Sequence, residues 1–260
     1  YSTTVQDRGR PGFAHLGVPT AGAIDLRTHD QMNRLVGNPA DAATIETMGA
    51  LIVEALRPVV VAISTDGHRQ TLAAGERVHV DVPSHSVWAY LAVRGGVDTQ
   101  IVLGSRSQDT LGKVGPPPLA LDIPVAIGAD PRTPLDADHA PRRPPRTDRI
   151  RIWDGPQYDW FVGGVSCLAG RSWTLTNEVS RVGVRLEVGD FPTSTRAQPA
   201  MSSIGLTAGA VQITSAGAPI VMLANHPTTG GYPVIGVVDP DDLADLAQTR
   251  PGEVVRFRRA

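Results

Sequence analysis

The segment from Ala218 to Val238 constrains the fold more than any other part of the sequence. Two short apolar runs, rich in Ile and Val, flank a polar loop that contains Gly230 and Gly231. Because β-branched residues in short continuous blocks favour strands covered on both faces, we expect two buried strands joined by this loop. The loop carries hydroxyl, amide and imidazole groups. It is therefore either an anion-binding loop or a solvated hairpin turn.

The composition also favours strands. The chain has 260 residues with 27 Gly and 22 Pro, which is typical of many short strands joined by turns. We predict a mainly β protein with a few short helices, divided into a unit of residues 1–128, a linker of residues 129–149 and a unit of residues 150–260. The linker prediction rests on five prolines among charged residues and on the loss of apolar periodicity.

Charge and cysteine content exclude several classes of protein. The net charge is −2 and no basic stripe is visible, which argues against nucleic acid as a partner. A single cysteine, Cys167, allows no intrachain disulfide, and no apolar run is long enough to span a membrane. With no signal peptide visible, we expect a cytoplasmic protein. The chain begins at Tyr1 rather than Met, so we expect a short preceding piece.

Local signals predict two helices among the strands. Asp25 is a suitable N-cap for a helix that ends at Gly37, and Asp239 with Pro240 is a suitable start for a second helix. Residues 40–48 are expected to form a short helix or a turn. The predicted strands are a brief strand that ends at Gln6 and residues 51–55, 59–64, 70–72, 77–82, 87–93, 150–153, 173–176, 185–187, 218–224, 234–238 and 253–257. Residues 208–213 lead into the segment from Ala218 to Val238.

Familiar catalytic patterns are missing. The sequence has no phosphate-binding loop of the Walker type, no dinucleotide-binding glycine motif and no Gly-x-Ser-x-Gly nucleophile elbow. Cys167 lies among small residues without a neighbouring histidine in the sequence, which favours a structural thiol. These observations argue against direct nucleotide binding by this chain and against a serine hydrolase.

Two polar clusters have both a functional and an ordinary interpretation. His79, Asp81 and His85 include ligand types that suit a metal, but a short hairpin with these residues is more often a surface feature, so we predict no metal site. Asp109 near Arg106 is either a general base or half of a local ion pair that holds a loop. The sequence does not choose between these alternatives.

Several motifs taken together resemble the biotin-dependent carboxyltransferase family, also called allophanate hydrolase subunit 2. This family includes the C subunit of 5-oxoprolinase and an antagonist of a sporulation-kinase inhibitor. The resemblance covers nearly the whole chain. The motifs are residues 4–12, 17–19, 22–25, 35–39, 92–98, 103–107, 209–212 and 228–233.

The resemblance implies two β-barrel units similar to cyclophilin. It implies a subunit-1 homologue as partner, a third LamB-like subunit, and a small amide substrate. The implied function is ATP-dependent hydrolysis of pyroglutamate to glutamate by the complex, with ATP acting at the level of the complex. One alternative is a carboxyltransferase-type subunit in urea or allophanate metabolism. Another is a non-catalytic module that antagonises a kinase inhibitor. No Met-Lys-Met segment is present, so no biotin is expected on this chain.

If the chain is an enzyme subunit, its polar loops supply the site. The catalytic candidates are Gln212, Thr229 and His226, without a definite assignment. Hydrogen-bonding groups on the loop are expected to bind substrate oxygens, and arginines are expected to hold a carboxylate. The predicted substrate-binding residues are Arg8, Arg94, Arg181, Gln212, Asn225, Thr228, Thr229, Gly230, Gly231 and Tyr232.

The sequence departs from the family pattern at this loop. Residues 225–227 are Asn, His and Pro where relatives commonly have Asp and Arg, and Val234 stands where many relatives have Lys. These changes alter the charge of the predicted site.

Overall fold

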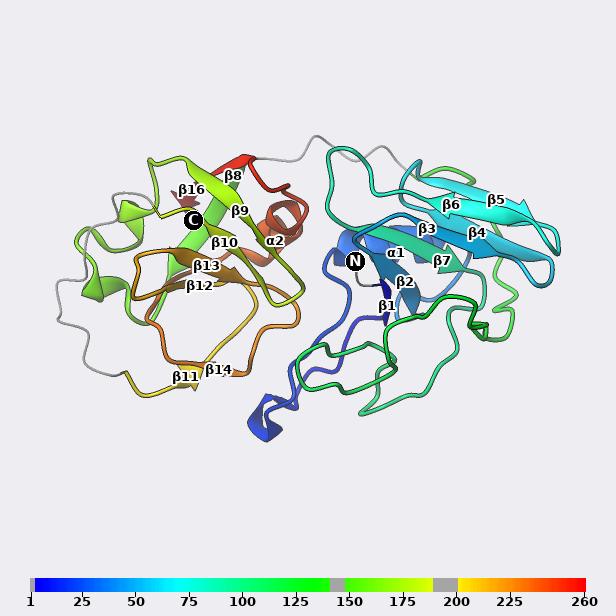
Figure 1. Cartoon of the computed structure of the whole chain (residues 1–260), viewed down its shortest axis with the longest axis horizontal. Helices are drawn as coiled ribbons and strands as arrows, with labels where there is room; N and C mark the ends of the chain where they lie inside the picture. The colour runs from blue at the N-terminus through cyan, green and yellow to red at the C-terminus, as the bar shows by residue number, and fades with distance from the viewer. Residues whose placement is uncertain (1–2, 141–147, 189–200) are drawn as a thin grey trace. The chain divides into compact units, whose positions relative to one another are not determined.

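The computed structural model describes residues 3–140, 148–188 and 201–260. The chain divides into two compact units. One unit consists of Tyr1–Pro11 and Thr20–Pro144, and the other of Gly12–Pro19 and Pro145–Ala260. Both units are built mainly from strands, which confirms the predicted mainly β class (Figure 1). Of the two barrel units that the resemblance implies, the second unit is a closed barrel, whereas the described strands of the first unit form two separate sheets.

The first unit contains a five-stranded antiparallel sheet and a separate two-stranded sheet. The strand order of the larger sheet is β1-β2-β7-β4-β5, and β3 pairs with β6. All five residues of the central strand β7 are buried, which explains why its sequence is a continuous apolar run. The bounds are β1 Thr3–Gln6, β2 Thr44–Thr47, β3 Leu51–Glu54, β4 Val59–Ile63, β5 His68–Leu72, β6 Arg77–Val80 and β7 Ala89–Val93.

Helix α1 (Leu26–Leu35) begins where the sequence predicts. The Asp25 side chain accepts hydrogen bonds from the backbone N–H of Thr28, at 3.1 Å, and from the Thr28 hydroxyl, at 2.8 Å. The helix buries Met32 and Leu35. Gly37 follows it with φ of 70°, a left-handed conformation that suits glycine after a helix end.

The prediction for residues 40–48 is wrong. Thr44–Thr47 form β2, which pairs with β1 on one side and β7 on the other. The polar residues in this segment gave no clear alternation. Pairing on both sides of the strand outweighs its weak local propensity.

A buried polar network links α1 to the sheet. The Tyr90 hydroxyl donates to Glu46 Oε2 at 2.7 Å and accepts from the backbone N–H of Asp25 at 2.8 Å. The backbone N–H of Ile24 donates to the same Glu46 oxygen at 2.8 Å. Burial, followed by the nearby charges of Glu46 and Asp25, raises the pKa of Tyr90 well above its usual value.

We expect Tyr90→Phe to lower the free energy of unfolding by about 1–3 kcal/mol, because two buried polar groups lose a partner. Since the folded pKa of Tyr90 is raised, the wild-type advantage is complete below pH of about 10. It is lost as the pH rises through the folded pKa. Urea denaturation at pH 7–11 measures this difference. Tyr158→Phe, at a side chain that is 45% exposed, is the matched control and should have no effect. Equal stability of the wild type and Tyr90→Phe would contradict the prediction.

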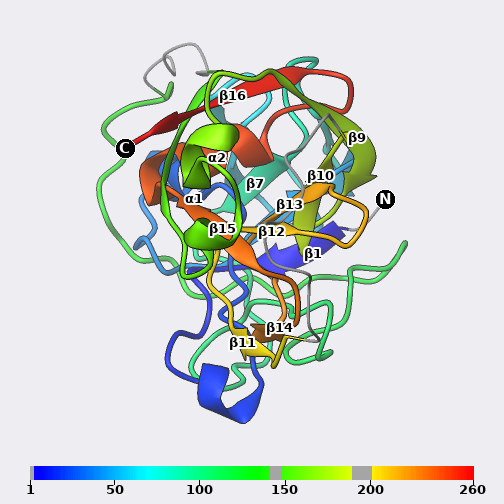
Figure 2. The same ribbon diagram turned by 90° about the vertical axis from the view of Figure 1, so that its left-hand side faces the viewer.

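The second unit is a closed barrel with strand order β10-β13-β12-β15-β8-β16-β9. Figure 2 faces this unit and shows β12, β13 and β15 beside one another. Apolar side chains of the barrel, including Ile150, Leu175 and Val211, are almost completely buried. The bounds are β8 Arg149–Asp154, β9 Trp173–Val179, β10 Gly183–Leu186, β12 Ala210–Ile213, β13 Pro219–Met222, β15 Val234–Val238 and β16 Val254–Arg259.

Shorter elements complete the second unit. Helix α2 (Pro240–Ala247) is capped by Asp239, with Pro240 at its first position, as the sequence predicts. A two-stranded sheet pairs β11 (Ile204–Gly205) with β14 (Thr229–Gly230). Three short 3₁₀ helices are η1 (Ala14–Leu16), η2 (Tyr158–Trp160) and η3 (Gly164–Cys167).

The described part of the segment predicted as a linker is divided between the two units, because Asp148 and Arg149 belong to the second unit and Arg149 begins β8. Residues 130–140 are hydrogen-bonded to the first unit: Arg94 bonds Asp130 and Thr133, and the backbone N–H of Arg69 donates to the carbonyl of Asp138 at 2.7 Å. Residues 141–147 lie outside the described residues. Backbone bonds of this kind need no apolar periodicity, so the sequence pattern gave no sign of them.

No helix within the described residues has both the length and the apolar character needed to cross a membrane.

Candidate functional site

The polar loop after β13 contains a short paired strand and is not a simple hairpin turn. Its Thr229 and Gly230 form β14, which pairs with β11 in antiparallel register. The backbone N–H of Leu206 donates to the carbonyl of Thr228 at 2.9 Å and continues this pairing. The two strands lie side by side in both views (Figures 1 and 2). The polar residues of the loop are therefore held by a second segment that the sequence did not indicate.

Gln212 connects the barrel to this loop. It lies in β12 at a bulge in the pairing with β15, and only 3% of the residue is exposed. Its side-chain amide Nε2 donates to the carbonyl of Tyr232 at 2.9 Å. Bulges commonly re-aim side chains next to functional sites. The structure thus brings Gln212 together with the predicted binding loop.

The sequence suggests that glycine at position 230 lets a ligand approach the backbone, but the structure gives another reason for it. A Cβ atom at this position would lie 2.6 Å from Gln212 Nε2 and 2.7 Å from Leu206 Cδ1. The glycine therefore makes room for neighbouring side chains of the same unit. Thr229, Gly231 and Tyr232 are the exposed residues of the loop.

His226 has an arrangement that suits proton transfer. Its Nδ1 lies 2.7 Å from the carbonyl of Pro227, and only 8% of the residue is exposed. Because a carbonyl can only accept a hydrogen bond, Nδ1 carries the proton in this pair, and the neutral ring has its lone pair on Nε2. His226 can then accept a proton through Nε2.

Asn225 and Arg181 lie next to each other near His226. The backbone N–H of Asn225 donates to the carbonyl of Arg181 at 2.9 Å, and both residues are buried. Of the predicted residues of the second unit, Gln212 is bonded to the loop through its side chain and Arg181 is bonded to Asn225 through its backbone carbonyl. A shared binding site for Arg181, Gln212, Asn225, His226, Thr228, Thr229, Gly230, Gly231 and Tyr232 stays a prediction.

The two other predicted arginines belong to the first unit. Arg8 is exposed and pairs with Asp30 at 2.9 Å. Arg94 donates from Nε to Asp130 at 2.9 Å, from Nη1 to the carbonyl of Val36 at 3.0 Å and from Nη2 to the carbonyl of Thr133 at 2.9 Å. These bonds give Arg94 a structural role at the end of α1. Its role in binding a carboxylate stays a prediction.

The sequence analysis names Asp109 but missed the buried polar cluster to which it belongs in the first unit. We call it the Asp7 cluster, and it consists of Gln6, Asp7, Arg10, Ser105, Ser107, Gln108 and Asp109. Asp7 Oδ1 accepts from the hydroxyls of Ser105, at 2.6 Å, and Ser107, at 2.5 Å, and from the backbone N–H of Gly9, at 2.8 Å. Asp7 Oδ2 accepts from the backbone N–H of Arg106 at 2.6 Å. This carboxylate joins the loop after β1 to residues 105–107.

Arg10 is the cation of the Asp7 cluster. It is 1% exposed and donates to the carbonyls of Val102 and Ser107. Burial lowers its pKa, and the charges of Asp7 and Asp109 act in the opposite direction. Three buried atoms, Arg10 Nη1, Gln6 Oε1 and Gln108 Oε1, have no hydrogen-bond partner among the described residues. Since buried polar groups are normally satisfied, these atoms suit contact with water or a small polar molecule.

The structure explains why the recognisable motifs occur together. Residues 4–12 contact residues 103–107 through Asp7, and residues 209–212 contact residues 228–233 through Gln212. Residues 35–39 contact residues 92–98 through Asn38, whose side chain bonds the backbone of Val93 and Gly95 at 2.8 Å each. Each of these motifs is therefore half of a contact pair within one unit.

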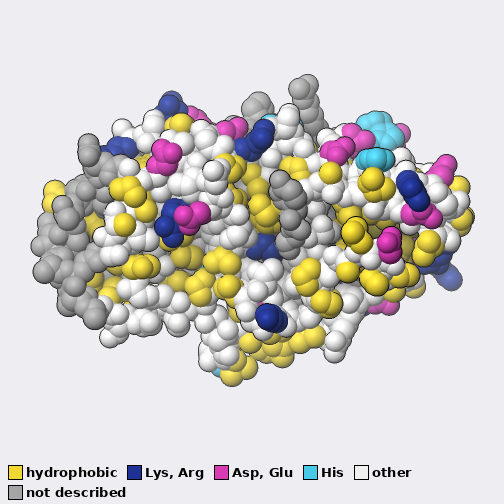
Figure 3. Space-filling view, viewed as in Figure 1, with side chains coloured by type: hydrophobic (Ala, Val, Ile, Leu, Met, Phe, Trp, Pro, Cys, Tyr) yellow, Lys and Arg dark blue, Asp and Glu magenta, His cyan; other side chains and the backbone are white. Residues whose placement is uncertain are grey.

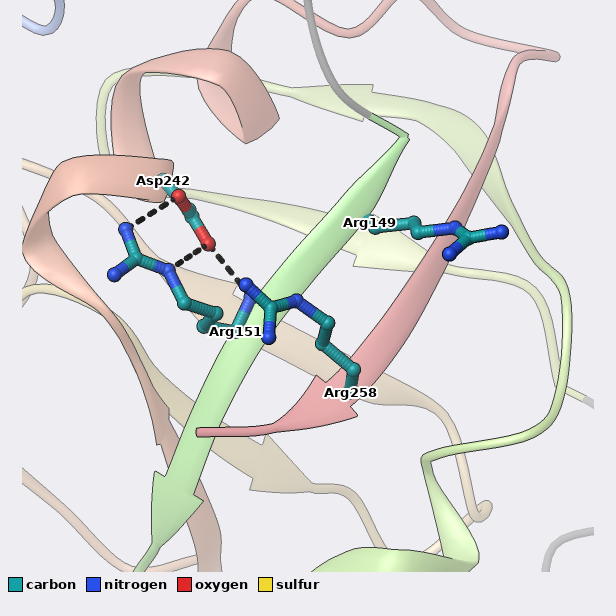
Figure 4. A pocket seen from close by; sticks show the side chains of 4 residues that line it. All are labelled: Arg149, Arg151, Asp242 and Arg258. Carbon is teal, nitrogen blue, oxygen red and sulfur yellow. Dashed lines mark hydrogen bonds and ion pairs between the residues drawn. The ribbon is translucent and has the colours of Figure 1, made fainter.

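A pocket of about 490 Å³ on the second unit is lined by Arg149, Arg151, Asp242 and Arg258 (Figure 4). Arg151 of β8 donates from Nε and Nη2 to the two oxygens of Asp242, at 2.9 and 2.8 Å. Partial burial alone raises the pKa of Asp242, but hydrogen bonds and charge from Arg151 bring it below its usual value. The hydrogen bonds that Asp242 accepts likewise raise the pKa of Arg151. This pair holds α2 against the barrel.

We expect Asp242→Asn to lower the free energy of unfolding by about 1–3 kcal/mol, because charged hydrogen bonds to Arg151 are lost. The folded pKa of Asp242 is lowered, so its contribution is present above the unfolded value of about 3.9. It disappears as the pH falls through the folded pKa. Urea denaturation at pH 3–7 tests this. Asp241→Asn, at a side chain that is 84% exposed and 3.7 Å from Arg151, is the control. A loss of stability that does not change with pH would count against the ion pair.

The remaining candidates from the sequence have ordinary surroundings. Arg106 pairs with Asp98 at 2.8 Å rather than serving as the partner of Asp109. Burial raises the pKa of the Cys167 thiol, with Arg171 acting in the opposite direction, which favours an unreactive thiol. His79, Asp81 and His85 do not gather into a metal-binding group in the part of the chain that the structure describes.

Comparison with known proteins identifies the family. The model of the family described as "Carboxyltransferase domain, subdomain A and B" matches residues 16–259. The chain belongs to this family. The match confirms the relationship that the sequence motifs indicated.

Two kinds of relative share this carboxyltransferase domain. The C subunit of the 5-oxoprolinase of Escherichia coli is 34% identical over 98% of this chain and 87% of its own length. The urea amidolyase of Lachancea kluyveri is 26% identical over 98% of this chain, which corresponds to 16% of that much longer protein. The domain therefore occurs both as a separate subunit and within a larger polypeptide.

Solved structures have the same fold. The TTHA0988 protein superimposes with a TM-score of 0.86 at 31% identity, over 99% of this chain and 54% of that one. The Kluyveromyces lactis urea amidolyase has the same TM-score of 0.86 at 24% identity, over 98% of this chain and 18% of that one. This chain thus spans about half of the TTHA0988 chain.

Proposed function

We propose that this chain is a subunit of a hetero-oligomeric, ATP-dependent amidohydrolase of the 5-oxoprolinase type, which opens pyroglutamate to glutamate. The observation that supports this most strongly is the 34% identity to the C subunit of a 5-oxoprolinase over nearly the full length of both chains. The other parts of the complex are a homologue of the family's subunit 1 and a third, LamB-like subunit. The sequence has no phosphate-binding loop, so the proposal assigns ATP to another subunit.

The loop after β13 would contribute hydrogen bonds to the substrate. The Thr228 and Thr229 hydroxyls and the backbone of Gly231 are the donors, and they stabilise negative charge that develops on the lactam oxygen. Gln212 keeps the loop in place through its bond to the Tyr232 carbonyl. His226 Nε2 accepts a proton from the attacking water. Groups from the partner protein complete the site.

The test is reconstitution with both partner subunits. The chain should co-purify with the subunit-1 homologue, and the complete mixture should hydrolyse ATP faster when pyroglutamate is added. A known 5-oxoprolinase complex serves as the active control. If the assembled complex shows no pyroglutamate-dependent ATP hydrolysis while the control is active, the 5-oxoprolinase assignment fails.

A second candidate function is a carboxyltransferase subunit in urea or allophanate metabolism. The matches to urea amidolyases support it, although the sequence identity is lower, at 26%. The same reconstitution separates the two candidates. Urea carboxylation in the presence of a biotin carboxylase and a biotin carrier, without turnover of pyroglutamate, would favour this second function. A functional response that is unaffected by changes at Gln212 and Thr229 would favour a non-catalytic binding module.

A further inference from the structure

His68 and His139 face each other across two paired segments of the first unit. The two residues form an antiparallel bridge, although β5 and the segment around His139 are far apart in sequence. Residues directly opposite each other in such a pair place their side chains on the same face, with Cβ atoms about 5 Å apart. The imidazole rings lie with centroids 4.1 Å apart at an interplanar angle of 74°.

The backbone holds this pairing on both sides of the bridge. The N–H of Arg69 donates to the carbonyl of Asp138 at 2.7 Å, and the N–H of Ala140 donates to the carbonyl of Gly67 at 2.7 Å. The N–H of His68 is bonded to the side chain of Asp66 at 3.0 Å. The side chain of Arg69 is bonded elsewhere in the first unit. Its Nη1 bonds the carbonyls of Leu35 and Ala137.

Asp138 adds a carboxylate to the two imidazoles. Its Oδ1 lies 2.8 Å from His139 Nδ1. An exposed aspartate is ionised at neutral pH, so Asp138 can serve as an anionic ligand. One ligand atom from each of the three residues lies within 4.8 Å of the others. Figure 3 shows histidine side chains gathered beside acidic ones above the region of β5 and β6.

We propose that His68, Asp138 and His139 bind a divalent transition-metal ion of the Zn²⁺ type. Two imidazoles and one carboxylate form a ligand set that suits Zn²⁺, whereas Mg²⁺ and Ca²⁺ prefer oxygen ligands. In a tetrahedral zinc site neighbouring ligand atoms are about 3.4 Å apart. Side-chain rotations that move the ligand atoms by about 1 Å therefore bring them into place. Asp138 and His68 are at least partly exposed, which leaves the fourth position for water.

Metal binding would fasten residues 138–139 to β5. This is a structural role, independent of the reaction proposed above, because it concerns only the face of the first unit that carries the three side chains. The bound ion replaces the edge contact between the two rings with bonds to a common centre. Opening of the segment would then require the loss of a metal–ligand bond as well as the backbone bonds.

Zinc titration of the full chain tests the proposal. We expect one Zn²⁺ per chain at this site, measured by isothermal titration calorimetry in a buffer that does not chelate. His68→Ala and His139→Ala should each weaken binding at least ~10-fold, and Asp138→Asn about 10-fold. His79→Ala, at another exposed histidine, is the matched control and should bind like the wild type. Mg²⁺ at the same concentration should give no binding.

A second measurement locates the ion by its effect on backbone amides. Zn²⁺ should slow amide hydrogen exchange at Arg69 and Ala140, whose N–H groups bond across the paired segments. His79→Ala should show the same slowing. If Zn²⁺ does not bind, or if it binds equally well to His68→Ala and His139→Ala and leaves these two amides unchanged, then the cluster is only an aromatic contact with a local ion pair.

Discussion

Replacing Asp7 with Ala should lower the free energy of unfolding of the first unit by roughly 3–5 kcal/mol, because a buried, hydrogen-bonded carboxylate is removed. Four donors converge on this side chain, from Gly9, Ser105, Arg106 and Ser107. The change leaves these donors without an acceptor. It also leaves the buried Arg10 with one nearby negative charge fewer. Hydrogen exchange of the β7 amides in increasing urea reports on this unit alone.

The control for this prediction is Asp98→Ala. Asp98 also accepts a bond from Arg106, but its side chain is 53% exposed. An exposed ion pair contributes about 0–1 kcal/mol, so this variant should remain close to the wild type. Asp7→Asn should fall between the two, because it keeps the shape but turns part of an acceptor into a donor. If Asp7→Ala and Asp98→Ala cost the same, then the Asp7 cluster does not support the fold.

Changing Gln212 to Ala should lower kcat/KM for pyroglutamate about 100-fold in the assembled complex, since displacement of a binding loop by about 1 Å has an effect of this size. The variant removes the donor to the Tyr232 carbonyl and opens space beside Gly230. Gln212 acts through the loop, so it is a positioning residue. Most of the loss should be in kcat, because the loop is proposed to bind developing charge.

Gln248→Ala is the matched control for this second prediction. Gln248 is as buried as Gln212, at 3% exposure, and follows α2. Both variants should lose stability, but only Gln212→Ala should lose activity. The split between kcat and KM separates positioning from a general loss of structure. Equal activity of the two variants, measured with the same amount of assembled complex, would show that Gln212 has no part in the site.

Local signals in the sequence predicted those elements whose causes are local. Asp25 and Asp239 cap their helices because a side-chain oxygen needs only a backbone N–H two or three residues ahead. The apolar run of β15 is buried as expected from its composition. The predicted loop was also found in contact with Gln212. These features depend on residues that are close in sequence or strongly patterned.

Features that depend on contacts between residues far apart in the sequence could not be predicted from local patterns. Arg8 was singled out from its motif, yet it is exposed, whereas its neighbours Asp7 and Arg10 are buried. The direction of each side chain in that loop is set by Ser105 and Ser107, nearly a hundred residues away. β14 depends in the same way on β11. The periodicity of hydrophobic residues and the position of turn residues do not indicate which distant segment a residue or strand will contact.

We propose that this carboxyltransferase domain works in pyroglutamate hydrolysis only as part of a complex. The most direct measurement follows labelled pyroglutamate and ATP with all three subunits, and with each subunit left out in turn. We expect labelled glutamate from the complete mixture and none when this chain is omitted. Glutamate formed at the same rate without this chain would contradict it.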